Sequence, residues 1–225
     1  MMTRIYFVRH CEAEGNTKGI LQGRSDFGIS GNALKQLELI SLRLRNVPFA
    51  AIYSSPLQRA YKTALSIDRY HHLGVKKEKG LVEIDMGRWE NCPWESVKRS
   101  DPELVRIWDE TPGSFEAPGG ESIFHVAERM KRTVSAIVKS NPDETVCAVS
   151  HGCAIRSYLC TALGLPLQRL NEVPWGDNTA VSVVEYENEK PHVILVNDAS
   201  HLPADLSVYR ASRGAGNGIM GSTAS

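Results

Sequence analysis

Short apolar segments alternate along the chain with longer segments in which apolar residues recur every three or four positions. Residues 4–8, 50–53 and 144–150 are short runs rich in β-branched, aromatic and small apolar side chains, which is typical of buried strands. Residues 30–45 instead place leucine and isoleucine at near-helical spacing among polar residues. The alternation of such strands with amphipathic helices predicts an α/β fold, a three-layer α/β/α sandwich with a mostly parallel sheet and helices on both faces.

Local residues predict where several helices begin and end. Ser55, which precedes a proline, predicts an N-cap with proline in the first turn of a helix over 57–70. Ser122 predicts the N-cap of the next long helix, and Gly164 predicts the end of the helix that follows His151. Helices and strands therefore follow one another with few connecting residues.

Three further segments complete the expected sheet. Residues 180–186 and 192–196 are apolar runs on either side of the charged turn 187–191, which predicts a hairpin and an antiparallel edge strand. Residues 75–82 form a weaker strand pattern that leads to Glu83.

The chain is expected to form one domain over residues 1–209. Within it, residues 85–120 contain three of the four tryptophans and four prolines, which predicts an irregular insertion with short helices that covers one end of the sheet. Substrate choice is expected to depend on this insertion. Residues 210–225 are rich in Gly, Ser and Ala and offer little to bury, so we expect a flexible C-terminal tail.

Charge and hydropathy exclude several classes of protein. The 26 lysines and arginines balance 26 aspartates and glutamates, whereas a general nucleic-acid binder carries a basic excess. No apolar run approaches the ~20 residues of a membrane span, and residues 1–8 lead into a strand pattern without signal-peptide architecture. We therefore expect a cytoplasmic protein that binds neither nucleic acid nor membrane.

Cysteine and histidine spacing argues against structural cross-links. The five cysteines are odd in number and contain no Cys-x-x-Cys pair, which indicates free thiols in a reducing compartment. None of the seven histidines pairs with a cysteine or another histidine at the short spacings of structural zinc sites. We expect neither a disulfide nor a metal site.

Five polar residues occupy the expected carboxyl ends of strands, where open α/β sheets bind ligands. They are Arg9, His10, Arg59, Glu83 and His151. Taken singly, each has an ordinary structural explanation, such as a solvated helix residue or a buried histidine. Together they would form a local cationic cup with one carboxylate beside it, which suits a phosphoryl group.

The residues around His10 resemble a known signature. The stretch from Phe7 to Asn16 resembles the Arg-His-Gly-Glu-x-x-x-Asn motif of the histidine phosphatase superfamily, which includes the cofactor-dependent phosphoglycerate mutases. The resemblance covers about residues 3–200. Further blocks follow in the family's order: Gly23 to Asp26, Ser54 to Ala60, Thr63-Ala64, Glu83, Gly87 to Glu90, Pro118 to Ser122, and Ser150 to Gly152.

This resemblance implies roles for the five strand-end residues. His10 is implied to be the nucleophile that forms a phosphohistidine, with its other ring nitrogen held by a backbone carbonyl. Arg9, Arg59 and His151 are implied to surround the phosphoryl oxygens, and Glu83 to act as the general acid that protonates the leaving group. No metal and no cofactor is required.

A second set of residues is implied to bind phosphate or substrate: Asn16, Gln22, Gly23, Arg24 and Gly152. Asn16 matches the family residue that donates its amide to phosphate, although without the resemblance a turn residue beside Gly15 is the favoured interpretation. Arg24 is a candidate for a second anionic group. Gly152 is expected to allow close backbone approach at a helix N-terminus that favours an anion, or simply tight packing.

One departure from the family pattern lies beside the nucleophile. Cys11 replaces the usual Gly or Ala, which suggests the hypothesis of an oxidation-sensitive thiol among cationic groups. The alternative interpretation is a small side chain filling a small space.

Three functions remain open at this point. The first is a metal-independent phosphomonoesterase acting on a small phosphorylated metabolite, as a monomer or homodimer. The second is a phosphoglycerate mutase; against it, the segment between the Gly-x-Trp-Glu and Gly-Gly-Glu-Ser blocks has only Lys98, Arg99 and Arg106 among six acidic residues. The third, a non-catalytic phospho-ligand binding module, would require a missing catalytic residue, and none is missing.

Overall fold

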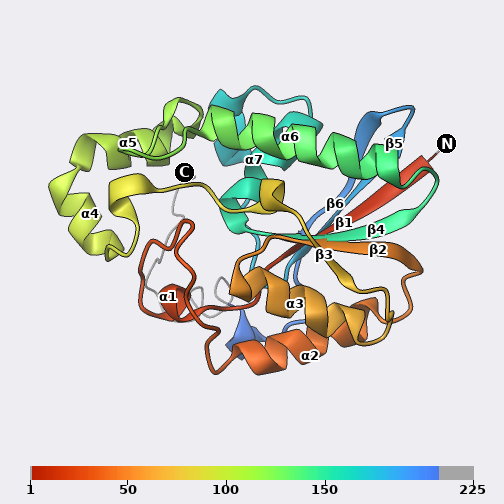
Figure 1. The fold of residues 1–225 in the computed structure, drawn as a ribbon. Coiled ribbons are helices and arrows are strands. Elements are labelled where there is room, and N and C mark those ends of the chain that lie inside the picture. Colours follow the sequence, from red (N-terminus) through yellow and green to blue (C-terminus); the bar gives the residue numbers. More distant parts are fainter. Residues whose placement is uncertain (1, 208–225) are drawn as a thin grey trace.

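The computed structural model describes residues 2–207, so the predicted flexible tail over 210–225 lies outside the described residues. Across the described part, the centre of the molecule is a six-stranded sheet of order β3-β2-β4-β1-β5-β6 (Figure 1). The strands β1 to β4 are parallel, β5 is antiparallel to β1, and β6 is antiparallel to β5. Their bounds are Met2–Arg9 (β1), Phe49–Ser54 (β2), Val75–Lys77 (β3), Thr145–Ser150 (β4), Val181–Glu187 (β5) and Lys190–Asp198 (β6).

Helices cover both faces of this sheet, which confirms the predicted three-layer sandwich. On one face lie α2 (Ala33–Leu44) and α3 (Gln58–Asp68), and on the other lie α6 (Ile123–Ser140) and α7 (Gly152–Ala162) (Figure 1). Each face buries its own apolar cluster, one including Ile40 and Ile67, the other including Met130 and Leu159. Burial of these side chains is the main favourable contribution to the fold.

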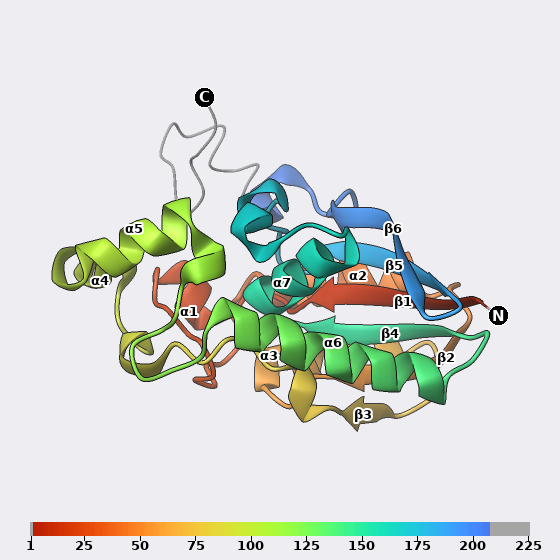
Figure 2. The same cartoon turned by 90° about the horizontal axis from the view of Figure 1, so that it is seen from above.

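The insertion predicted over 85–120 contains four short helical elements in the structure. These are η2 (Gly87–Trp89), α4 (Trp94–Ser100), α5 (Pro102–Glu110) and η3 (Pro112–Ser114). Seen from above, α4 and α5 project beyond the carboxyl end of β1, and the short helix α1 (Glu14–Thr17) also lies beyond that end (Figure 2). Aromatic rings hold the insertion together, with Phe115 centred 4.8 Å from Trp108 and 5.3 Å from Trp89.

Several predicted boundaries are confirmed. The hydroxyl of Ser122 accepts a hydrogen bond from His125 N and caps α6. Gly164 has a φ of +71° after the end of α7, the left-handed conformation that glycine adopts at helix ends. The β5–β6 hairpin turns through Asn188 and Glu189, both with positive φ.

Two boundary predictions are wrong. The strand expected over 75–82 ends at Lys77 and continues as the 3-10 turn η1 (Lys79–Leu81), because the Glu78 side chain accepts a hydrogen bond from Gly80 N and folds the chain away from the sheet. Ser55 is not an N-cap, since α3 starts at Gln58, with Leu57 in the cap position. The Ser55 hydroxyl instead lies 2.7 Å from Nε2 of His151.

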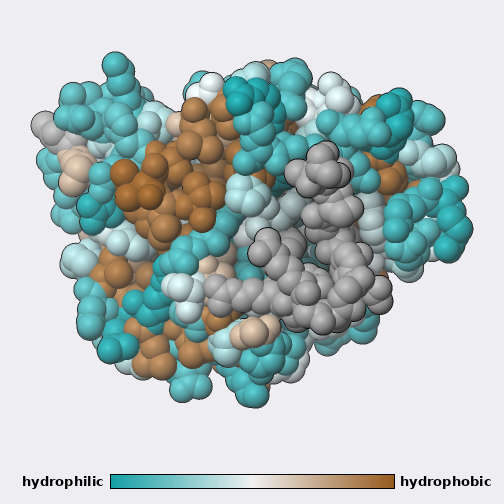
Figure 3. All heavy atoms as spheres, turned by 180° about the vertical axis from the view of Figure 1, so that it is seen from behind, coloured by the Kyte–Doolittle hydropathy of each residue, from teal (hydrophilic) through white to brown (hydrophobic). Residues whose placement is uncertain are grey.

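The structure also shows the state of the five cysteines and whether a described helix could cross a membrane. All five cysteines carry free thiols, and four of them are buried. Between residues 2 and 207 there is no helix whose length and apolar character would let it span a bilayer. Viewed from behind, the surface shows apolar areas set among hydrophilic residues (Figure 3).

Candidate active site

The sheet register brings the two candidate histidines together. Strands β1 and β4 are parallel neighbours in which Arg9 pairs with Ser150, so the residues that follow them, His10 and His151, leave the sheet side by side. Their ring centroids lie 5.1 Å apart, and only 4% of His10 and none of His151 is exposed. Residues far apart in the chain therefore meet at the carboxyl end of the sheet, as α/β folds favour.

Backbone contacts fix the ring of His10. Its Nδ1 lies 2.6 Å from the carbonyl oxygen of Cys11, which can only accept, so Nδ1 carries the proton. The carbonyl oxygen of His10 itself accepts from Nδ2 of Asn178 at 3.0 Å. These contacts leave Nε2 of His10 as the nitrogen with the free lone pair.

Two guanidinium groups stand beside the histidines. Arg59, in the first turn of α3, is 1% exposed and donates to the carbonyl oxygens of Gly23 and Ser25, both at 2.8 Å. Arg9, at the end of β1, donates through Nη1 to the carbonyl oxygen of Gly176. Backbone acceptors, not carboxylates, thus orient both guanidiniums, which keeps their positive charge available to an anion.

Burial and these cations keep both imidazoles neutral. Burial lowers the pKa of His10 well below its ordinary value, and the charges of Arg59 and Arg9 lower it further. Burial likewise lowers the pKa of His151, again with Arg59 as the next cause. A neutral His10 keeps the lone pair that a nucleophile needs.

Unpartnered polar atoms concentrate at this site. Within residues 2–207, six buried side-chain nitrogen or oxygen atoms have no hydrogen-bond partner, and five of them belong to residues of the site or its contacts. These five are Arg9 Nε, Gln22 Oε1, Arg59 Nε, His151 Nδ1 and Asn178 Oδ1. Buried polar groups normally have partners, so two orphaned guanidinium N–H donors indicate a site built for an anion.

The side chain of Glu83 lies at the N-terminus of α7, although Glu83 itself comes long before that helix in the chain. One carboxylate oxygen accepts from Ile84 N and Ala154 N, both at 3.0 Å, and the other accepts from Cys153 N at 3.1 Å. The expectation that this helix terminus faces the anion therefore needs correction, because two of its amides bind Glu83. The helix terminus instead holds the carboxyl group of Glu83 in place through these hydrogen bonds.

Gly152 begins α7 in a tightly packed position. A Cβ there would lie 3.2 Å from the Trp175 ring and 3.4 Å from Nε of Arg9. The close approach seen at Gly152 is therefore to Trp175 and Arg9.

A half-buried arginine that the sequence analysis did not single out holds the segment before Glu83. Arg129 of α6 donates to the carbonyl oxygens of Gly80, Val82 and Glu83 at 2.8, 2.8 and 3.3 Å. It also pairs with both carboxylate oxygens of Glu121, at 3.0 and 2.9 Å. A guanidinium is suited to this task, since its donors form a rigid planar fork.

Arg24 does not offer a free charge for a second anion. Its guanidinium lies 3.3 Å from Asp85 and 3.2 Å from Glu121, and its Nε approaches the carbonyl oxygen of Glu83 at 3.5 Å. Two carboxylates therefore compensate the charge that the sequence analysis assigned to ligand binding. The structure makes Arg24 part of the network around Glu83.

Glu90 supports the loop that holds Arg59. Its carboxylate accepts from the backbone N of Arg24 at 2.7 Å and from the Ser25 hydroxyl at 2.8 Å. A Cβ on Gly23, whose φ is +50°, would lie 2.3 Å from the same carboxylate. Gly23 is therefore required by this close approach, and its carbonyl oxygen binds Arg59.

Asn16 and Gln22 lie in the neighbouring loop. Oδ1 of Asn16 accepts from Ala13 N at 2.9 Å, which leaves the NH2 group of the same amide to donate elsewhere. Gln22 is 9% exposed, and its side chain fills the space above Gly15, where a Cβ would lie 2.4 Å from it. Their proposed contact with a ligand stays a prediction.

The structure favours the packing interpretation of Cys11. The side chain is fully buried, its backbone N donates to the Thr63 hydroxyl at 2.9 Å, and its sulfur faces the carbonyl oxygen of Arg59. Burial raises the pKa of the Cys11 thiol to about 11, so it is not the easily ionised group that the oxidation hypothesis requires.

The loop before β5 is a part of the site that the sequence analysis missed. Gly176 and Asn178 contact Arg9 and His10, and Thr179 N donates to the carbonyl oxygens of both at 3.1 and 3.3 Å. A Pro-Trp-Gly-Asp-Asn cluster at 174–178 marks a turn in the sequence, but nothing local shows that it returns to β1.

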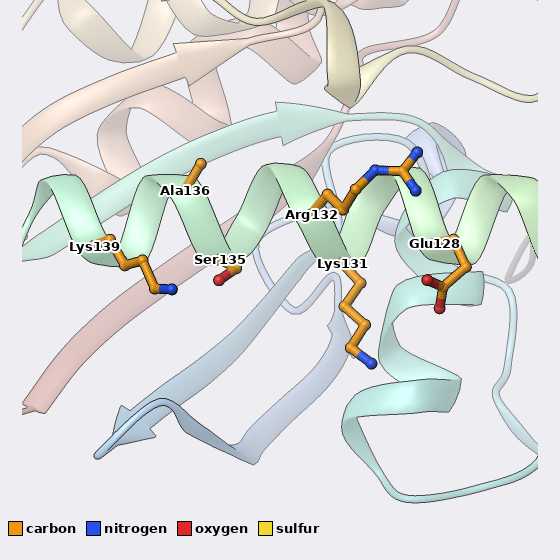
Figure 4. A pocket seen from close by; sticks show the side chains of 6 residues that line it. All are labelled: Glu128, Lys131, Arg132, Ser135, Ala136 and Lys139. Carbon is orange, nitrogen blue, oxygen red and sulfur yellow. The ribbon is translucent and has the colours of Figure 1, made fainter.

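A second surface feature shares no residue with this site. A hollow on α6 is lined by six residues of that helix: Glu128, Lys131, Arg132, Ser135, Ala136 and Lys139 (Figure 4). Its long side chains are solvated and Lys139 pairs with Glu189 of the hairpin, so the hollow is a polar helix surface. No group of three or more candidate metal ligands occurs among residues 2–207.

Known proteins share both the sequence and the fold. Phosphoserine phosphatase 1 of Hydrogenobacter thermophilus is 36% identical over 204 residues, which cover 89% of this chain and 95% of that protein. The solved structure of Bacillus stearothermophilus YhfR matches with a TM-score of 0.85 at 28% identity, covering 88% of this chain and 98% of that one. A phosphoserine phosphatase mutant from Entamoeba histolytica, solved in complex with phosphoserine, matches with a TM-score of 0.78 at 25% identity over 89% of this chain and all of that one.

The family model of the histidine phosphatase superfamily (branch 1) matches residues 5–199, which is most of the chain. This range contains every residue of the cationic cup and the carboxylate beside it. The chain therefore belongs to branch 1 of the histidine phosphatase superfamily, as its resemblance to that family predicted.

Proposed function

We propose that this protein is a metal-independent phosphomonoesterase that works through a phosphohistidine on His10. The observation that carries the proposal is the environment of this ring. Its Nδ1 is held by the Cys11 carbonyl, and its Nε2 is free beside two guanidiniums whose buried Nε donors have no partner. A tetrahedral phosphoryl group would supply the acceptors that these donors lack.

In the first step, Nε2 of His10 attacks phosphorus and forms a P–N bond while the ester P–O bond breaks. The leaving alkoxide takes a proton from the carboxyl group of Glu83, because an alkoxide leaves poorly without one. In the second step, water attacks the phosphohistidine and gives its proton to the Glu83 carboxylate. The P–N bond breaks, inorganic phosphate leaves, and His10 is neutral again.

The other residues of the cup stabilise charge. Arg9, Arg59 and His151 are proposed to donate hydrogen bonds to the equatorial oxygens, where charge is greatest during phosphoryl transfer. Asn16 is proposed to add its amide NH2, and Gln22 to meet the substrate beyond the phosphate. Gly152 acts through Arg9, since its lack of a side chain permits their close approach.

The substrate is proposed to be a small phosphorylated metabolite, with phosphoserine as the first candidate. The support is the name of the Hydrogenobacter thermophilus relative at 36% identity and the phosphoserine complex of the Entamoeba histolytica structure. A cytoplasmic location is part of the proposal, because free buried thiols fit a reducing compartment.

A panel of phosphate esters tests this function. Phosphate release is measured from phosphoserine, 3-phosphoglycerate, sugar phosphates and p-nitrophenyl phosphate, with and without EDTA, together with a phosphoglycerate mutase assay. We expect hydrolysis that EDTA leaves unchanged and an acid-labile phosphoenzyme on rapid quench. Loss of activity with EDTA, or mutase activity well above hydrolysis, would contradict the proposal.

A further inference from the structure

Ser55 contacts the second histidine of the cup and has no role in the proposed function. It lies directly after β2, is fully buried, and its hydroxyl oxygen is 2.7 Å from Nε2 of His151. The same oxygen accepts a long hydrogen bond, at 3.4 Å, from Leu57 N. The other ring nitrogen, Nδ1 of His151, is buried without a partner.

Counting protons distinguishes the two neutral forms of His151. If Nε2 carries the proton and donates to Ser55, the Ser55 hydroxyl proton has no acceptor in these contacts and Nδ1 presents a buried lone pair. If Ser55 donates to Nε2 instead, its proton is used and Nδ1 carries an N–H. The second arrangement leaves one donor unpartnered, and an anion in the cup satisfies it.

We propose that Ser55 is a positioning residue that donates its hydroxyl proton to Nε2 of His151 and thereby makes Nδ1 of His151 a hydrogen-bond donor to the phosphoryl group. This inference deepens the proposed function and rests on it for the ligand. The opposite form would direct a lone pair at a negatively charged oxygen, which repels it. The hydroxyl thus decides whether the buried histidine attracts or repels the ligand.

The protonation of His151 itself gives the direct test. In ¹⁵N-histidine-labelled wild-type protein at pH 7.5 without phosphate, long-range ¹H–¹⁵N spectra distinguish a protonated ring nitrogen from an unprotonated one. We expect His151 to carry its proton on Nδ1. A proton on Nε2 in the wild type overturns the inference, and this measurement needs neither a variant nor an active enzyme.

Ser55→Ala tests the effect on ligand binding, with Ser54→Ala as the matched control. Ser54, the last residue of β2, is equally buried, but its hydroxyl donates to the Ser55 carbonyl oxygen and not to His151. We expect Ser55→Ala to weaken inhibition by orthovanadate and to slow phosphorylation of His10, each by about 10- to 100-fold, the usual effect of one hydrogen bond to a charged group. Ser54→Ala should stay within about twofold of wild type. Equal inhibition constants in Ser55→Ala and wild type overturn the inference.

Replacement of His151 adds a comparison that is independent of Ser55. The amide nitrogen of an asparagine takes the place of Nδ1, whereas that of a glutamine takes the place of Nε2. We expect His151→Asn to phosphorylate at least about 10-fold faster than His151→Gln. Equal rates or the reverse order count against the inference. Absence of hydrolysis of every ester in the wild type would contradict the proposed function instead, and would leave the spectroscopic result on His151 standing.

Discussion

Nδ1 of His10 lies 2.6 Å from the carbonyl oxygen of Cys11, its neighbour in the chain. Because the acceptor belongs to the adjacent residue, the ring is oriented by local backbone geometry and keeps its orientation without a carboxylate partner. A carboxylate would stabilise the imidazolium and raise the pKa, whereas a carbonyl leaves the neutral ring favoured among two arginines.

His10→Ala is expected to abolish both turnover and labelling of the enzyme. Without the imidazole no P–N bond can form, and the remaining donors can only bind the ester. Rapid quench with ³²P-labelled substrate measures the acid-labile label, and phosphate release measures turnover. Retention of turnover without label would show that water attacks the ester directly.

Glu83→Gln is expected to slow phosphorylation of His10 by about 10²- to 10⁴-fold for an alkyl phosphate. The amide keeps hydrogen-bonding groups but cannot protonate the leaving oxygen. The loss should be much smaller for p-nitrophenyl phosphate, whose phenolate leaves without a proton. Single-turnover rates for both esters check the contrast, and equal losses would exclude the acid role.

Arg129→Met is expected to reduce the rate for an alkyl phosphate by about 10²-fold, because the segment 80–83 loses the donors that place Glu83. The loss should again be smaller for p-nitrophenyl phosphate, which distinguishes misplacement of the acid from general unfolding. Arg132→Met on the exposed side of α6 is the matched control and should be neutral. A uniform loss for both esters would assign Arg129 to stability alone.

Acid should destabilise the phosphate-free protein below about pH 6.5. Buried His10 and His151 have pKa values lowered well below the ordinary value, whereas in the unfolded chain they titrate near 6.5. The unfolded state therefore binds more protons as the pH falls, and stability present above pH 6.5 is lost below it, by about 1 kcal/mol per histidine for each pH unit. Urea unfolding at pH 7.5 and 5.5 measures the loss. His10→Gln should reduce this loss, and an unchanged loss would show that the pKa of His10 is the same in the folded and the unfolded protein.

Peroxide is expected to inactivate wild type and Cys11→Ala at the same rate. The Cys11 thiol is fully buried and its pKa is raised to about 11, so almost no thiolate is present near neutral pH. Residual activity during a timed peroxide exposure provides the measurement. Protection by Cys11→Ala would mean that the thiol becomes accessible through motion of the site.

Local patterns predicted the layers of this fold because the spacing of apolar residues within each segment is enough to indicate a buried strand or an amphipathic helix. The apolar runs of β1, β2 and β4 indicate buried strands, and the spacing of apolar residues in α2 and α6 indicates which side of each helix faces the core. Parallel order at the centre of the sheet then places the ends of β1 and β4 together. His10 and His151 could for that reason be brought to one site from sequence alone.

Other features depend on contacts between segments that no local pattern records. Ser55 has the sequence context of an N-cap, yet its hydroxyl meets His151, 96 residues away. Arg129 is one of several cations on α6, and only the fold places it on the carbonyls before Glu83. The order of residues along the chain is enough to specify the periodic elements and the chemical groups at their ends. Which donor meets which acceptor follows from the folded chain alone, because hydrogen bonds depend on distances and angles that are set only when distant segments pack.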